Sequence, residues 1–181
     1  ETSPLEMASA YGTFANRGVR VAPTGILRVV DRDGNVLIDN TQPRGTVVLD
    51  PVVADNMTDV LRGVVAAGTG KSAQLPDRPV AGKTGTAQAY RAAWFVGYTP
   101  QLATAVWMGH ADGQDSLVGV NGVRAVTGGT HPAVAWHDYM AAATVGTEVV
   151  PFPVPAEIVP LAKTQAEVAE VVNAPVRPTR V

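Results

Sequence analysis

The chain has 181 residues, of which 46% are hydrophobic and 17% charged, a balance that suits one globular domain and argues against disorder throughout. Its formal net charge of -2, from 14 basic and 16 acidic side chains, gives no electrostatic reason to expect nucleic acid or an anionic membrane surface as a partner. Without cysteine it can form no disulfide, thiolate nucleophile or cysteine-ligated zinc site. No stretch reaches the roughly 18 to 20 apolar residues of a membrane span. Any anchor or export signal is therefore expected outside this chain.

The first residues predict a helix. Ser3 can cap it, Pro4 suits its first turn and Glu6 completes a capping box. Apolar residues recur at helical spacing as far as Ala15, and Gly18 is expected to end the helix. Because no leader comes before this helix, we expect the chain to be cut from within a larger domain.

A β-hairpin and a second helix are expected next. Residues 25–30 and 36–38 are strand-like and flank a polar turn that contains a glycine, Asp31–Asn35. Asp50-Pro51 then opens a helix that should end near Gly68. An apolar stripe at three- and four-residue steps predicts its buried face: Val53, Met57, Val60, Leu61 and Val64.

Three closely spaced strand-like segments predict an antiparallel meander: Pro79–Gln88, Ala93–Tyr98 and Leu102–Gly109. A last helix is expected from Thr130 to Ala143. From Thr147 onward prolines become frequent, so residues 147–181 are expected to form an extended, proline-rich tail that contributes little to the site. Within it, Leu161–Val172 has enough helix formers for a short helix.

The glycine-rich segment Ala67–Ala73 matches a phosphate-binding loop only in part. It contains Gly70-Lys71-Ser72, but Val65 stands where that loop needs its first glycine. Prolines at 76 and 79 interrupt the helix that should follow, which also argues against a dinucleotide-binding fingerprint. We interpret the segment as the end of a helix and a loop.

The histidines do not predict a metal site. His131 and His137 fall on different faces of the expected helix, no carboxylate completes a zinc pattern, and His110 is only loosely paired with Asp112. They are interpreted as surface or hydrogen-bonded residues, and no metal or organic cofactor is expected. The tryptophans are interpreted as core or interface residues: Trp94, Trp107 and Trp136.

One segment, residues 80–87 (Val-Ala-Gly-Lys-Thr-Gly-Thr-Ala), gathers small residues and hydroxyls around a single lysine. Gly82 and Gly85 lack the side chains that would keep the backbone of a peptide ligand away from a strand edge. Lys83 would supply a fixed positive charge beside such a ligand. The segment therefore predicts a ligand-binding strand.

The two threonines of this segment add hydrogen-bond donors. Thr84 and Thr86 offer hydroxyls to a carboxylate, and the backbone N–H of Thr86 can point at a developing oxyanion. The simpler interpretation is a glycine-weakened edge strand with a solvated lysine, and it would prevail for an isolated Lys-Thr-Gly tripeptide. The sequence around the tripeptide reverses that preference.

Lys-Thr-Gly is the third element of the serine β-lactamase and penicillin-binding protein site. Several further segments, in the same order along the chain, resemble the transpeptidase domain of penicillin-binding proteins, most closely the bifunctional class A: Ser3–Asn16, Gly63–Gly70, Val80–Gln88, Trp94–Pro100, Ala105–Gly109 and Thr127–Pro132. The resemblance implies an α/β fold, β-lactamase/transpeptidase-like, in which helices flank an antiparallel sheet. Residues 1–146 would be the carboxyl-terminal half of that domain.

The resemblance also implies an activity. A serine of the domain would attack the D-Ala-D-Ala bond of a peptidoglycan stem peptide, an amine of a neighbouring stem would resolve the acyl-enzyme, and β-lactams would mimic the donor. Lys83 and Thr86 would be catalytic, and Lys83, Thr84, Gly85 and Thr86 would bind the substrate, the N–H of Thr86 forming half of the oxyanion hole. The protein would face the outside of the bacterial cell membrane, anchored by a segment not in this chain.

The chain departs from the family in one decisive respect, because no Ser-x-x-Lys or Ser-x-Asn occurs in it. Its serines are followed three residues later by Glu, Gly, Leu and Gly: Ser3, Ser9, Ser72 and Ser116. The nucleophile and the second motif are therefore expected on a preceding amino-terminal segment of the same domain, and this chain alone is expected to be inactive. A smaller departure is Ala92, where the family commonly has an acidic residue.

Two alternatives stay open. A serine β-lactamase shares the fold but must accelerate attack by water on the acyl-enzyme, and the ordered segments favour the synthetic enzyme over it. A non-catalytic scaffold domain could also retain the fold. The sequence immediately upstream would separate all three.

Overall fold

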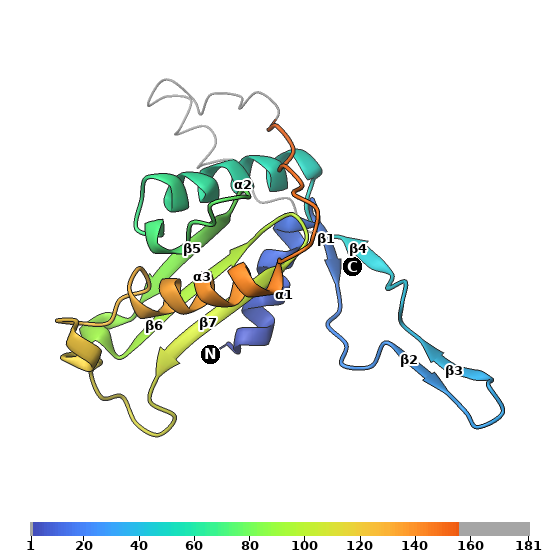
Figure 1. Cartoon of the computed structure of the whole chain (residues 1–181), viewed down its shortest axis with the longest axis horizontal. Coiled ribbons are helices and arrows are strands. Elements are labelled where there is room, and N and C mark those ends of the chain that lie inside the picture. Colours follow the sequence, from blue (N-terminus) through green and yellow to red (C-terminus); the bar gives the residue numbers. More distant parts are fainter. Residues whose placement is uncertain (1, 156–181) are drawn as a thin grey trace, which may run out of the picture.

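A computed structural model describes residues 2–155 of the chain. Its centre is a three-stranded antiparallel sheet in the order β5-β6-β7, formed by β5 (Ala81–Thr86), β6 (Ala92–Tyr98) and β7 (Ala103–Gly109). Helix α1 (Pro4–Ala15) lies on one face of this sheet and α3 (His131–Ala143) on the other, while α2 (Pro51–Ala66) runs alongside β5 (Figure 1). The predicted meander and the predicted fold class are both confirmed. The helix predicted at Leu161–Val172 lies outside the described residues.

Helix α1 forms as the sequence predicts. The hydroxyl of Ser3 accepts a hydrogen bond from the Glu6 N–H at 3.3 Å, and the Glu6 carboxylate accepts one from the Ser3 N–H at 2.7 Å, so the capping box is complete. The helix ends at Ala15, and Gly18 follows with a φ of 87°. A Cβ at Gly18 would collide with the carbonyl of Leu49, so this turn requires glycine.

The predicted β-hairpin is confirmed as β2 (Arg28–Val30) and β3 (Val36–Asp39), which project away from the central sheet in Figure 1. In its turn the Asp31 carboxylate accepts from the N–H groups of Asp33 and Asn35 at 2.9 and 2.8 Å. A second antiparallel pair was not predicted: β1 (Val19–Val21) with β4 (Gly45–Val47). Three residues are too few to show a two-residue period in the sequence.

Helix α2 begins and ends where expected, but its predicted buried face is wrong. Its buried residues are Ala54, Asp55, Thr58, Leu61 and Val65, so only Leu61 of the predicted stripe is buried. Val53, Met57 and Val60 are 52%, 40% and 60% exposed. The reason is that two polar residues on this face have partners elsewhere in the fold: Thr58 Oγ1 lies 2.9 Å from the Tyr98 hydroxyl, and Asp55 binds Arg17. These contacts turn the helix away from the face that hydrophobicity alone selects.

The core lies on both faces of the sheet. On the α3 face, the fully buried rings of Phe95 and Trp136 meet edge to face with centroids 5.2 Å apart. On the α1 face, Tyr98 meets Phe152 at 5.6 Å. Phe152 is only 8% exposed, so the segment after α3 contributes to the core to a degree that its prolines did not predict.

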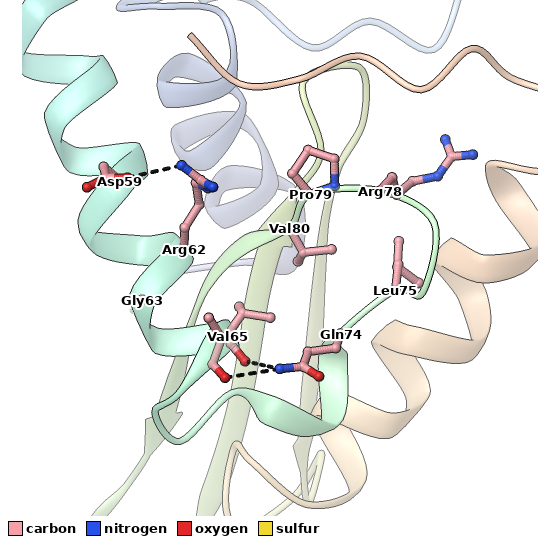
Figure 2. A pocket seen from close by; sticks show the side chains of 10 residues that line it. Asp59, Arg62, Gly63, Val65, Gln74, Leu75, Arg78, Pro79 and Val80 are labelled. Atoms are coloured by element: carbon pink, nitrogen blue, oxygen red, sulfur yellow. Dashed lines mark hydrogen bonds and ion pairs between the residues drawn. The ribbon is translucent and has the colours of Figure 1, made fainter. Parts of the chain in front are cut away.

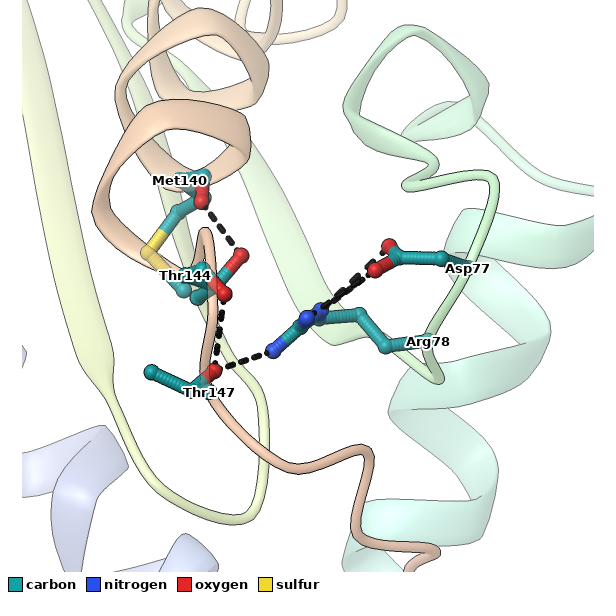
Figure 3. Close-up of polar contacts among 5 residues, drawn as sticks. All are labelled: Asp77, Arg78, Met140, Thr144 and Thr147. Atoms are coloured by element: carbon teal, nitrogen blue, oxygen red, sulfur yellow. Dashed lines mark hydrogen bonds and ion pairs between the residues drawn. The ribbon is translucent and has the colours of Figure 1, made fainter.

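The segment after α3 is also held by polar contacts (Figure 3). The Arg78 guanidinium, whose side chain is 5% exposed, donates to the Thr147 hydroxyl at 2.8 Å and pairs with Asp77. The Thr147 hydroxyl in turn donates to the Thr144 carbonyl at 2.8 Å. Residues 148–155 form neither helix nor strand, and the extended tail and its boundary at 146/147 stay predictions.

Candidate functional site

The predicted site residues lie together on β5, at the edge of the sheet. Lys83 is paired with Val96 and Thr84 with Phe95 in the register with β6. Because side chains alternate along a strand, Thr84 and Thr86 share the α3 face of the sheet, while Lys83 and Gly85 belong to the opposite face. Within residues 2–155, β5 has no strand partner on its other side.

The backbone N–H of Thr86 points toward this unpaired edge. The Ala87 N–H donates to the Ala92 carbonyl at 2.8 Å, and antiparallel pairs alternate between hydrogen-bonded and non-hydrogen-bonded residues. The pair of Thr86 with Ala93 is therefore of the non-hydrogen-bonded kind, and the N–H and C=O groups of Thr84 and Thr86 point away from β6. Such an outward N–H is available to a ligand.

The ammonium group of Lys83 lies at the same edge. Its side chain is exposed, and Nζ donates to the Thr84 carbonyl at 2.9 Å. That carbonyl points away from β6, so the contact bends the lysine toward the free edge of β5. None of the ion pairs within the described residues involves Lys83. Its positive charge thus lies at the edge toward which the Thr86 N–H points, and no carboxylate of the described residues pairs with it.

Both threonine hydroxyls have a partner from a neighbouring loop. Thr84 Oγ1 lies 2.7 Å from the hydroxyl oxygen of Thr69, which follows the end of α2. Thr86 Oγ1 accepts a hydrogen bond from the Gly128 N–H at 3.2 Å. Sequence reasoning assigned Thr69 and Gly128 no role, although both lie in glycine-containing segments that were noted for their resemblance to the family.

The glycines of β5 have a packing role in the sheet, and the expectation that they admit a ligand's backbone stays a prediction. A Cβ at Gly82 would lie 2.8 Å from the ring of Phe95, and one at Gly85 would lie 3.2 Å from the Cβ of Trp94. The space at both positions is filled by side chains of β6, so these glycines permit close packing within the sheet. Any ligand contact of Gly85 must involve its backbone.

The loop before α3 packs directly on β5. A Cβ at Gly128 would collide with the backbone of Gly85 and Trp94, and one at Gly129 with the carbonyl of Thr69. The Thr130 hydroxyl accepts from the Thr127 N–H at 3.0 Å and donates to the Thr127 carbonyl at 2.8 Å, which closes the loop. Two glycines are thus needed for the loop to reach the threonines of β5.

A polar hollow beside α2 is separate from the predicted site. Figure 2 shows residues that line it, which belong to α2 and to residues 74–80, and its volume is about 430 Å³. On its wall the Gln74 side-chain amide donates to the Val65 and Ala66 carbonyls at 3.0 and 3.1 Å. Arg62 at its rim is paired with Asp59 at 3.1 Å. None of Lys83, Thr84, Gly85 and Thr86 lines it.

The remaining candidates take structural positions. His137 Nδ1 lies 2.7 Å from the Gln74 carbonyl, and Trp136 is fully buried. Lys71–Ala73 forms a single 3-10 turn. Trp94 and Trp107 form a tilted pair with centroids 6.3 Å apart. Within residues 2–155 no three metal-ligating side chains come together, and no helix has the length and apolar character that crossing a membrane requires.

Comparisons with known proteins give a consistent result. The family model described as penicillin binding protein transpeptidase domain matches residues 1–120. Penicillin-binding protein 1A of Mycolicibacterium smegmatis is 41% identical over 161 residues, which is 85% of this chain and 20% of that protein. The protein of the same name from Aquifex aeolicus is 39% identical over 144 residues, 80% of this chain and 19% of the relative. The chain thus spans about a fifth of the length of these curated relatives.

A solved structure shares the fold as well. The PonA1 protein from Mycobacterium tuberculosis, determined in complex with penicillin V, is 36% identical to this chain and superposes with a TM-score of 0.78. The match covers 87% of this chain and 42% of that one.

Proposed function

Because the chain belongs to the penicillin-binding protein transpeptidase family, most like its class A members, we propose that it supplies the Lys-Thr-Gly strand of a D,D-transpeptidase that cross-links peptidoglycan stem peptides. The reaction is an acyl transfer through a serine. The substrate is the D-Ala-D-Ala end of a stem peptide, and β-lactams bind at the same place. Similarity to PonA1, which was determined in complex with penicillin V, supports β-lactam binding.

The single observation that carries the proposal is the free edge of β5. There the outward N–H of Thr86, the two threonine hydroxyls and the unneutralised charge of Lys83 come together on 4 adjacent residues of one strand. A peptide laid along this edge would meet N–H and C=O groups at every second residue. Its carboxylate would accept from Thr84 and Thr86 while its scissile carbonyl faces the Thr86 N–H.

Each of these groups has a task in acyl transfer. When the serine attacks, negative charge develops on the carbonyl oxygen, and the Thr86 N–H stabilises it as half of the oxyanion hole. Loss of one such donor costs about 2.7 to 4 kcal/mol of transition-state stabilisation. Lys83 adds positive charge at the same place, and the hydroxyls of Thr84 and Thr86 fix the donor through its terminal carboxylate.

The nucleophile belongs to another part of the same domain in this proposal. Acylation needs a serine activated by a neighbouring base, and none of the serines here has a lysine one helical turn onward. Ser3, for example, is occupied in capping α1. The amino-terminal segment with Ser-x-x-Lys and Ser-x-Asn is therefore the essential partner, and the membrane anchor that places the enzyme on the extracytoplasmic face also lies outside this chain.

The test is intact-mass spectrometry after incubation with penicillin, on this chain alone and on the chain joined to its amino-terminal partner. We expect a stoichiometric increase of one drug mass on the complete domain and none on this chain alone. An adduct on the isolated chain would disprove the division of labour. Rapid hydrolysis of the adduct would indicate a β-lactamase, and a complete domain that is never acylated would indicate a scaffold.

A further inference from the structure

We infer that Thr69 is a positioning residue for the carboxylate of the donor, acting through the hydroxyl of Thr84. The inference rests on the proposed function, because it concerns how the Lys-Thr-Gly strand holds its substrate. It adds a residue outside that strand, located where α2 ends, to the binding apparatus. The observation that carries it is the distance of 2.7 Å between the hydroxyl oxygens of Thr69 and Thr84.

The protons of the two hydroxyls decide what Thr84 can offer. Each hydroxyl has one proton to donate and two lone pairs. In the described part of the chain Thr69 Oγ1 has only Thr84 as a hydrogen-bond partner, and either oxygen can be the donor. An ionised carboxylate has no proton to donate, so a hydrogen bond between it and Thr84 must use the proton of Thr84. Thr69 must then donate to Thr84, and the chain of hydrogen bonds runs from Thr69 through Thr84 to the carboxylate.

The neighbouring threonine has the same arrangement with a different donor. Thr86 Oγ1 accepts from the Gly128 N–H at 3.2 Å, and a backbone N–H cannot reverse its role. The Thr86 proton is therefore free for a ligand. In both threonines a protein donor satisfies the oxygen and leaves the proton to be given to an anion. Hydrogen bonds in such a chain strengthen one another, which favours an anionic acceptor at its end.

Thr69 is held in place by its surroundings. The Gly68 and Gly70 N–H groups on either side of it donate to the Val64 carbonyl at 3.1 and 3.0 Å. Gly129 packs so closely on the Thr69 carbonyl that a Cβ there would collide with it. The backbone of Thr69 is thus fixed before any ligand binds, and its hydroxyl in turn fixes the side-chain rotamer of Thr84.

The experiment compares acylation of the complete domain by a β-lactam that carries its carboxylate and by the methyl ester of the same compound. The measured quantity is the second-order rate constant for the acid divided by that for the ester. We expect Thr69→Val to lower this ratio about fivefold, the effect of one neutral hydrogen bond, with the ester rate unchanged. Thr69→Ser keeps the hydroxyl and should stay within about twofold of the wild type.

Two further variants keep the result interpretable. If Thr69→Val does not fold, Thr69→Ala is compared with Thr69→Ser in the same assay. With Thr84→Val already present, Thr69→Val should lower the ratio no further. If the ratio is unchanged in Thr69→Val, whether both rate constants stay the same or both fall equally, the inference is overturned while the proposed function stays in place. A wild-type ratio near one would overturn the role of both threonines instead, and absence of acylation would overturn the proposed function itself.

Discussion

The guanidinium of Arg17 donates two hydrogen bonds to the carboxylate of Asp55, from Nε at 3.1 Å and from Nη2 at 2.8 Å. The pair joins the turn after α1 to the buried face of α2 across a sequence separation of 38 residues. Asp55 is 6% exposed, whereas the Arg17 side chain is 55% exposed. The Asp55 carboxylate is thus the desolvated member of the pair, and the Arg17 guanidinium stays largely hydrated.

This asymmetry predicts unequal costs of substitution. Arg17→Ala leaves a buried carboxylate without its cation and should lower the midpoint of thermal unfolding more than Asp55→Asn, which leaves an arginine that water can reach. Adding Asp55→Asn to Arg17→Ala should recover part of the loss. Arg62→Ala is the matched control, because its pair with Asp59 is exposed and should matter little. Equal effects of Arg17→Ala and Arg62→Ala would contradict the prediction.

Lys83→Ala in the complete domain should slow acylation by labelled penicillin about 100-fold or more, because the charge at the free edge of β5 is lost. The fold should be retained, since the side chain is exposed. Lys71→Ala, which removes another exposed lysine from the turn after α2, is the control and should acylate at the normal rate. A normal rate for Lys83→Ala would exclude the lysine from the chemistry.

Thr84→Val and Thr86→Val should each weaken binding of a donor that carries a carboxylate. The shape is kept, but a hydrogen bond to a charged group is lost, at about 1.5 to 3 kcal/mol. Each substitution should raise the Michaelis constant for the intact donor and leave the Michaelis constant for its carboxyl amide unchanged. Thr46→Val on exposed β4 serves as the control. An equal loss for both donors would argue against carboxylate recognition.

Burial raises the pKa of Tyr98 to about 12, an effect that its hydrogen bond with Thr58 partly offsets. In the unfolded chain tyrosine titrates near pH 10, so the folded state favours the protonated phenol. The contribution of the Tyr98 phenol to the free energy of unfolding is fully present below about pH 10. Between about pH 10 and about pH 12 this free energy should fall by about 1.4 kcal/mol per pH unit. Tyr11, whose pKa burial also raises, adds to the same decline.

Denaturant unfolding at increasing pH measures this decline. Tyr98→Phe should make the alkaline part of the stability curve shallower, whereas Tyr139→Phe, at a side chain that is 55% exposed, should leave it unchanged. A curve with the same slope in Tyr98→Phe and wild type would show that the buried phenol does not govern alkaline unfolding.

Phe152→Ala should destabilise the complete domain by about 3 kcal/mol, the low end for deleting a buried phenylalanine, since the segment can partly relax. Val154→Ala, two residues on and 90% exposed, should change the free energy of unfolding by less than about 0.5 kcal/mol. Truncation after residue 155 should leave acylation within a few-fold of normal. Equal stabilities of the two alanine variants would show that Phe152 does not belong to the core.

Local signals in the sequence were sufficient for most of the elements. The capping box of Ser3 and Glu6 involves residues within one turn, and the turn at Asp31–Asn35 makes its own hydrogen bonds, so both can be read without knowing the fold. The meander followed from short connections between strands. Lys83 and its neighbours were singled out because they are contiguous and because the segments around them resemble the family.

Contacts between distant segments were not predictable in the same way. The inward face of α2 depends on where Arg17 and Tyr98 lie, and neither is visible from the period of the helix. The hydroxyl of Thr69 meets that of Thr84 across 15 residues, through a loop whose course depends on the packing of Gly129. The positions of the glycines were evident, but which atoms they approach required the three-dimensional arrangement.

The contact between Phe152 and Tyr98 also determines where the chain leaves the sheet. Tyr98 is paired with Ala81 at the first residue of β5, whereas Thr86 is the last of its 6 residues. At roughly 3.3 Å per residue the two ends of the strand are about 17 Å apart. A reporter or affinity tag joined behind residue 155 is thus tethered at the end of the strand remote from Thr86, where a short linker keeps it clear of an incoming peptide.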